Sequence, residues 1–168
     1  MPTESGAPST SSRRESGLPN LGGTFAHVLQ RVPEAHRPLL IAVAERLAAE
    51  RYRGWAQEPS LADHAPLLLA CARREEEIAT RVEALFPRAA EIQRAMLEKN
   101  PDFLEINRSV FAGRPLPEQF GIQAQGERLG ASTWRALARK EESRVAREVY
   151  LACAELEQAS AVVLEAIL

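Results

Sequence analysis

The sequence LACARRE at residues 69–75 returns 82 residues later as LACAELE at residues 151–157. The match extends without a gap in both directions, so that residues 42–85 align with residues 124–167 and 15 of the 44 aligned positions are identical. A gapless repeat of this length is typical of a duplicated supersecondary unit. The apolar spacing within each copy is helical, and each copy has room for two helices. We therefore predict an all-α protein, a four-helix bundle made of two repeated helical hairpins.

The duplicated positions include two glutamates per copy, Glu45 and Glu75 in the first and Glu127 and Glu157 in the second. At steps of three and four residues, each glutamate interrupts a stripe of apolar or small side chains, which predicts that it faces the core. Each pair also brackets a predicted hairpin turn at similar distances, about 12 to 14 residues, and a helix rises roughly 1.5 Å per residue. All four carboxylates are therefore expected at one level, facing one axis.

The ends of the helices follow from prolines, glycines and breaks in the apolar period. Residues 1–24 are rich in Ser, Pro, Gly and Thr and are predicted to be a disordered tail, whereas residues 25–168 form one domain. The long connection at residues 87–116 contains a helix of its own at 88–99 and can cross from one end of the bundle to the other. The main helices are expected at residues 33–56, 61–86, 117–140 and 143–168, which gives repeat halves of 33–86 and 117–168.

Composition narrows the function classes. The 168 residues are 45% hydrophobic and 26% charged with a net charge of −2, so neither nucleic acid nor a membrane surface is an expected partner. No apolar run is long enough to span a bilayer and no secretory signal is visible, so we expect a cytoplasmic protein. Two cysteines do not make a disulfide framework. No nucleophile–histidine–acid pattern and no glycine-rich phosphate loop is present, and no catalytic residue is predicted.

Four ionised carboxylates in a helical core would cost several kcal/mol each without compensation. Two divalent metal ions would balance four negative charges, which is the arrangement of dimetal-carboxylate bundles. The sequence therefore predicts a metal site formed by Glu45, Glu75, Glu127 and Glu157.

With these features the chain resembles the ferritin-like superfamily, in particular four-helix bundles of the rubrerythrin and bacterioferritin type. The resemblance covers residues 33–168 and rests on the duplicated helix pairs, the long central connection and one inward glutamate per helix. It implies a dinuclear Fe or Mn centre with storage, oxidase or oxygenase-type chemistry. Glu45 and Glu127 would be the single carboxylates, while Glu75 and Glu157 would open the Glu-x-x-His motifs. The chain departs from that motif, because Ile78 and Ser160 stand in place of the histidines.

A metal-free interpretation stays open, in which the glutamates are relics paired with Arg, Tyr or Trp donors and no cofactor is bound. Tyr52 and Trp134 lie on the same helix faces as two of the glutamates and could reach them through water. Cys71 and Cys153 each lie one turn from a glutamate. They are candidates for soft metal ligands or a redox pair, or they are small core residues.

Without metal, the protein is expected to act as a binding or oligomerisation module. A homodimer is possible on this interpretation, as is a protein partner that contacts the connection at residues 87–117. The segment at residues 101–121 is unusually apolar for a connection. It can lie over the side of the bundle, form an interaction edge or line an entrance to the core.

Overall fold

The computed structural model describes residue 19 and residues 21–168. The predicted disordered tail at residues 1–24 therefore falls largely outside the described residues. The exceptions are residue 19 and residues 21–24, and residues 21–24 open helix α1 (Leu21–Arg31). The predicted boundary of the tail is wrong at these four positions.

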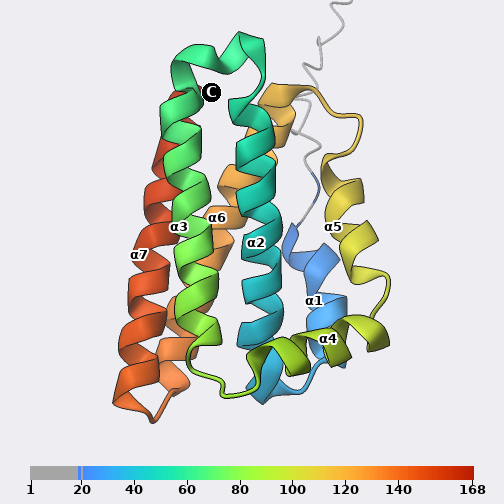
Figure 1. Cartoon of the computed structure of the whole chain (residues 1–168), viewed down its shortest axis with the longest axis vertical. Coiled ribbons are helices and arrows are strands. Elements are labelled where there is room, and N and C mark those ends of the chain that lie inside the picture. The colour runs from blue at the N-terminus through green and yellow to red at the C-terminus, as the bar shows by residue number, and fades with distance from the viewer. Residues whose placement is uncertain (1–18, 20) are drawn as a thin grey trace, which may run out of the picture.

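Across the part of the chain that the structure describes there are seven α-helices, two short 3₁₀ segments and no strand. The prediction of an all-α protein is confirmed. Four long helices run side by side in Figure 1: α2 (Arg37–Ala56), α3 (Ala65–Glu83), α6 (Leu116–Lys140) and α7 (Arg144–Ile167).

Two of the long helices begin later than the sequence predicted. The 3₁₀ segments Glu34–His36 and Pro59–His64 precede α2 and α3. Pro38 and Pro66 then occupy the first turns of these two helices. Proline lacks an amide hydrogen and fits only in the first turn, where that hydrogen has no partner within the helix. The prolines therefore set where the α-helical hydrogen bonding begins.

The long helices pack as two pairs. α2 lies along α3 and α6 lies along α7, and the pairs meet where α3 packs on α7. The backbones of α2 and α6 approach each other less closely. Between the pairs, the chain passes through α4 (Ala89–Lys99) and α5 (Phe103–Phe111). In Figure 1, α4 begins near the lower end of α2 and runs outward past α1, and α5 rises on the same side with α1 between it and α2 in this view, so the connection runs from one end to the other.

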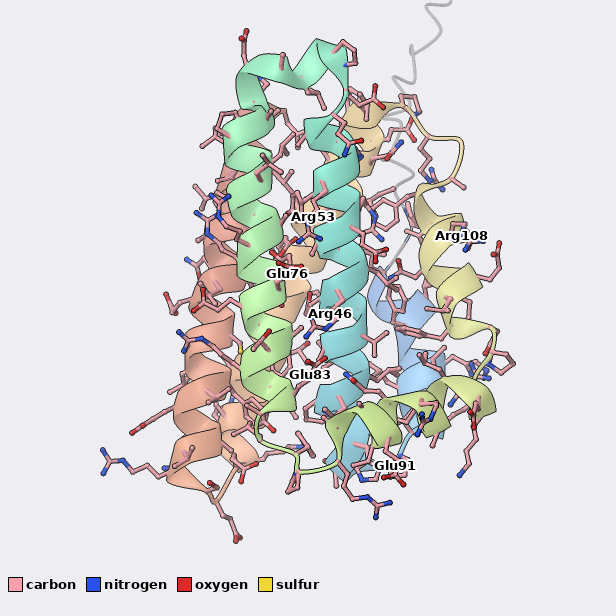
Figure 2. The ribbon with its side chains drawn as sticks, viewed as in Figure 1. Arg46, Arg53, Glu76, Glu83, Glu91 and Arg108 are labelled. Carbon is pink, nitrogen blue, oxygen red and sulfur yellow. The ribbon has the colours of Figure 1, made fainter. Side chains whose placement is uncertain are left out.

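Ion pairs at equivalent positions join the helices within each pair. Arg46 Nε on α2 donates to Glu83 Oε1 on α3 at 3.0 Å, and Arg128 Nε on α6 donates to Glu165 Oε1 on α7 at 2.9 Å. Both guanidinium groups make a second bond to the other carboxylate oxygen. Figure 2 shows Arg46 directed toward Glu83 and, higher in the view, Arg53 directed toward Glu76. The aligned positions of the two copies thus hold the same places in both pairs.

The core between the long helices has two apolar parts. The upper core lies toward the end that carries the turn between α2 and α3, and the lower core lies toward the other end. The upper core comprises Leu21, Ala49, Tyr52, Trp55, Leu61, Leu68, Cys71, Ala72, Val110, Phe111, Phe120, Ile122, Ala124 and Leu164. The lower core comprises Ala42, Ile78, Ala79, Val82, Trp134, Ala138, Ala146, Tyr150, Cys153 and Ala154. A separate side core beneath α1, α4 and α5 comprises Val28, Val32, Leu39, Leu40, Met96 and Phe103.

Candidate metal centre

The four repeated glutamates form a polar layer between the upper and lower cores. Glu45, Glu75, Glu127 and Glu157 lie on α2, α3, α6 and α7, and their exposed fractions are 8%, 0%, 1% and 2%. On α3, for example, the residue one turn before the glutamate belongs to the upper core and the residue three positions after it to the lower core. The predicted inward orientation of all four side chains is confirmed by this burial.

Three of the four carboxylates converge on one point. Glu45, Glu75 and Glu157 each offer an oxygen, and these three oxygens all lie within 4.8 Å of one another. Carboxylate oxygens bind divalent cations at about 2.0–2.6 Å. Two oxygens on opposite sides of such an ion are therefore about 4–5 Å apart. The spacing of the three glutamates is that of a ligand set for one divalent ion.

Glu127 is held beside this group by protein donors. Its Oε1 accepts hydrogen bonds from Tyr52 Oη at 2.7 Å and from Gln123 Nε2 at 2.7 Å. Its Oε2 is buried and has no hydrogen-bond partner. We expected Tyr52 to reach a glutamate through water, but it donates directly, and to α6 instead of its own helix. The sequence grouped all four glutamates alike, whereas the structure distinguishes Glu127 from the other three.

The other two donors also come from residues of the repeat. Ser160 Oγ on α7 donates to Glu75 Oε1 on α3 at 2.8 Å, which leaves Glu75 Oε2 buried without a partner. Trp134 Nε1 on α6 donates to Glu157 Oε1 at 2.9 Å, again directly and not through water. Ser160 aligns with Ile78 of the first copy, so only the second copy has a polar side chain at this position, and that side chain contacts the glutamate layer.

Gly130 makes room for one of the carboxylates. A β-carbon added at this position would lie 2.3 Å from Glu157 Oε1, closer than any real contact. In the first copy of the repeat the aligned residue is Ala48. The absence of a side chain on α6 therefore allows the Glu157 carboxylate to lie directly against the helix backbone. Sequence reasoning missed this residue, although the alanine-to-glycine difference between the copies was visible.

Burial and mutual repulsion raise the pKa values of three carboxyl groups in the layer. Desolvation, and then the charge of Glu127, raise the pKa of Glu45 to about 8. Desolvation is also the main cause that raises the pKa values of Glu75 and Glu157 well above the usual range, with the neighbouring carboxylates adding to it. Groups of this kind are neutral at pH 7 unless a cation offsets the charge. The layer can therefore hold protons or a metal ion.

A series of hydrogen-bonded polar side chains leads from the glutamate layer toward α5. Arg51 donates to Gln123 Oε1 at 2.6 Å and to Asn107 Oδ1 at 2.7 Å, and its guanidinium carbon lies 3.6 Å from the ring centre of Phe111. Gln123 in turn donates to Glu127, which connects this series to the glutamate layer. Desolvation lowers the pKa of Arg51 to about 10, so it remains charged at neutral pH. Sequence reasoning missed these residues, because nothing local distinguishes them from other helical polar side chains.

The two cysteines do not form the redox pair that the repeat suggested. Cys71 lies in the upper core and Cys153 in the lower core, so the glutamate layer separates them, and both are buried free thiols. Burial raises the pKa of Cys71 and raises that of Cys153 to about 12. A protonated thiol is a poor metal ligand. Both residues act as small apolar core residues here.

Comparison with protein-family models, with curated proteins and with solved structures returns no significant match. None of the helices among the described residues combines the length and the apolar character needed to cross a membrane.

Proposed function

We propose that the glutamate layer is a divalent metal centre, with Glu45, Glu75 and Glu157 as ligands and Glu127 beside them. The observation that carries the proposal is the convergence of three buried carboxylate oxygens within 4.8 Å of one another. A second observation supports it: one oxygen each of Glu75 and Glu127 is buried without a hydrogen-bond partner. Buried polar atoms are otherwise almost always paired.

The all-carboxylate ligand set suits a hard divalent cation such as Mn, and the ferritin-like resemblance adds Fe as a candidate. Carboxylate oxygens are hard ligands that suit divalent cations of this kind, and no histidine belongs to the convergent group within the described residues. Two ions would balance four carboxylates, so we retain a dinuclear site as the full complement. Bound Fe or Mn would supply redox chemistry, of the storage, oxidase or oxygenase type, that the side chains of the layer cannot perform themselves.

The same geometry supports a ferritin-like assignment for the four long helices. The Arg46–Glu83 and Arg128–Glu165 ion pairs hold equivalent places in the two helix pairs, as expected of two repeated hairpins. The connection between α3 and α6 runs from one end to the other (Figure 1), and each long helix contributes one inward glutamate. The departures at Ile78 and Ser160 would make this an all-carboxylate variant.

A metal-free function is the second candidate, and the donor network favours it. Tyr52, Trp134 and Ser160 already hydrogen-bond three of the glutamates, and the raised pKa values allow the carboxyls to be neutral. The protein would then be a cytoplasmic binding or oligomerisation module. It would act as a homodimer or through a protein partner on the connection at residues 87–117.

Elemental analysis separates the two candidates. The purified protein is incubated anaerobically with Mn(II) or Fe(II), desalted and analysed, alongside a double variant, Glu75→Gln with Glu157→Gln. The matched control, Glu77→Gln with Glu155→Gln, changes exposed glutamates two residues away on the same helices. We expect the wild-type protein and the control to retain about one to two ions per chain, and the first double variant to retain none.

Thermal unfolding gives an independent measure. A ligand that binds only the folded state raises the melting temperature. The metal should therefore raise the Tm of the wild-type protein and the control but not that of the layer variant. Equal metal retention by all three proteins, or no retention by the wild type, would overturn the metal proposal and leave the metal-free candidate.

A further inference from the structure

A pocket of about 140 Å³ lies between α2 and α6, on the side covered by α1 and α5. It occurs where the backbones of α2 and α6 approach each other less closely than those of α3 and α7. Its walls are mainly apolar and include Phe25 from α1, Leu40 and Ala44 from α2, and Phe103 from α5. Leu129 of α6 also lines it and is 41% exposed, which places the mouth of the pocket at this residue.

One glutamate of the layer lines the pocket. Glu45 lines the pocket and is the most exposed of the four glutamates. Gly130 lines it as well, and the missing side chain there is what leaves the Glu157 carboxylate against the backbone. A molecule in the pocket would therefore lie directly beside Glu45, one of the three convergent carboxylates.

The polar side chains at one corner of the pocket already contact one another. Arg51 is bonded to Gln123 and Asn107 and packs on Phe111, and all four residues line the pocket. Arg51 and Glu45 are the only charged side chains among the lining residues. The Arg51 guanidinium is already hydrogen-bonded to Gln123 and Asn107 and packed on Phe111, so these contacts compete with any pairing to an anionic ligand. An uncharged occupant is the one these walls favour.

We propose that this pocket binds a small, uncharged, mainly apolar molecule of about the size of one aromatic ring. An apolar protein cavity of roughly 150 Å³ accommodates benzene, which sets the scale. Apolar walls with a few polar groups at one end are the usual form of a small-molecule site. Because such a molecule would lie beside Glu45, molecules of this class are the substrates that the metal centre would act on. In that respect the inference rests on the proposed function.

Binding can be tested without any metal. Toluene, phenol and benzoate are titrated into chelator-treated protein, and binding is followed by ligand-observed NMR. We expect saturable binding of toluene and phenol and weaker binding of benzoate. Ala44→Leu and Thr133→Leu fill the pocket from α2 and from α6, and each should weaken toluene binding roughly tenfold or more, because added methyl groups overlap the ligand. Ala90→Leu, at an exposed position on α4, is the matched control and should bind like the wild type.

The place of the ligand is tested with metal-loaded protein. Mn(II) is paramagnetic, so the proton signals of bound toluene should broaden in the Mn-loaded protein and not in a Mg-loaded one. Ala44→Leu should remove the broadening but retain the manganese.

Each failure has its own meaning. Absence of toluene and phenol binding, benzoate binding more tightly than phenol, or equal binding by the filled variants would overturn the pocket assignment, even if metal is retained. Toluene binding without metal retention would leave the pocket standing and remove the proposed metal function. Retained manganese with no broadening would separate the pocket from the metal centre.

Discussion

In the first copy of the repeat, position 48 is alanine and position 78 is isoleucine, whereas the equivalent residues of the second copy are Gly130 and Ser160. Both differences fall on the glutamate layer. Gly130 leaves space that the Glu157 carboxylate fills, and Ser160 donates to Glu75 of the other copy. The surface ion pairs, in contrast, are retained in both copies. The duplicated residues thus preserve the packing of helix on helix, while the residues that differ give each carboxylate its own environment.

The pocket also depends on positions that differ between the two copies. Arg51 and Thr133 are aligned in the repeat and both line the pocket, one from each copy. Arg51 makes the polar corner against α5, and Thr133 leaves the other wall free of charge. A symmetric pair of arginines would put two like charges at one site. Because these aligned positions differ, a single arginine borders the apolar space beside Glu45.

The largest effect that we expect concerns pH. The pKa of Glu45 is raised to about 8, and those of Glu75 and Glu157 are raised well above the unfolded value near 4.5. A group with a higher pKa in the folded state stabilises the fold fully below its unfolded pKa, and this contribution is lost as pH rises through the folded pKa. The free energy of unfolding of metal-free protein should therefore fall from about pH 5 to about pH 8. Urea denaturation at several pH values measures this slope.

A variant of the layer should change that slope. Glu45→Gln removes one titrating group and should flatten the pH dependence, whereas Glu77→Gln, at an exposed position, should leave it as in the wild type. A wild-type protein whose stability does not decline over this range would contradict the assignment of raised pKa values.

A smaller effect tests the first difference between the copies. Gly130→Ala places a β-carbon against Glu157 and should lower the free energy of unfolding by about 1–3 kcal/mol, since the buried carboxylate must move. Gly54→Ala is the control, because nothing lies within 4 Å of the added atom. Alanine is the better helix former, so that variant should be neutral or stabilised by up to about 1 kcal/mol. Chemical denaturation checks both, and equal effects would show that Gly130 does not distinguish the copies.

Ser160, the counterpart of Ile78 in the first copy, should contribute less to stability. Ser160→Ala leaves both oxygens of Glu75 without a donor and should cost about 1–2 kcal/mol in metal-free protein. Ser132→Ala, which removes an exposed hydroxyl bonded only to the backbone of its own helix, should change stability by less than about 0.5 kcal/mol. If bound metal satisfies Glu75, the difference between the two variants should shrink on loading with Mn(II). A difference that is absent without metal would mean that the Ser160 bond contributes no stability.

The smallest effect tests what the copies share. Arg46→Ala and Arg128→Ala each remove an ion pair whose acid has a lowered pKa, at Glu83 and Glu165 respectively. Both pairs are accessible to solvent, so each variant should lower the Tm by only about 1–2 °C, and 1 M salt should remove most of the effect. Melting curves that differ strongly between the two variants would show that the copies are not equivalent at their surface.

The long helices and the glutamate layer could be predicted because their signals are periodic and repeated. Two other helices were not predicted. Residues 21–31 carry Leu21, Phe25 and Val28 at helical spacing, but the adjacent glycines and the polar tail before them outweighed that signal. α5 was not predicted because the Asn100-Pro101 break precedes it and because it is short. In both cases the helix is stabilised by packing on the side core, a long-range contribution that local propensity does not contain.

The inward position of the four glutamates could be predicted, but their individual environments could not. The partner of Tyr52 proved to be Glu127 on α6 and not Glu45, seven residues before it on its own helix. Which donor meets which carboxylate depends on the offset between helices, and a shift of one residue, about 1.5 Å, changes the partner. The contact between Gly130 and Glu157 depends on the same offset.

By itself the sequence determined the all-α class, the approximate extent of four helices and the inward direction of four glutamates, because helical periodicity is a local property of the chain. The tertiary structure alone decided that three carboxylates converge while Glu127 is held by Tyr52 and Gln123. It also decided that a pocket opens between α2 and α6. These features arise from the separation and offset of helices that are far apart in sequence, and those are set by the packing of many side chains together.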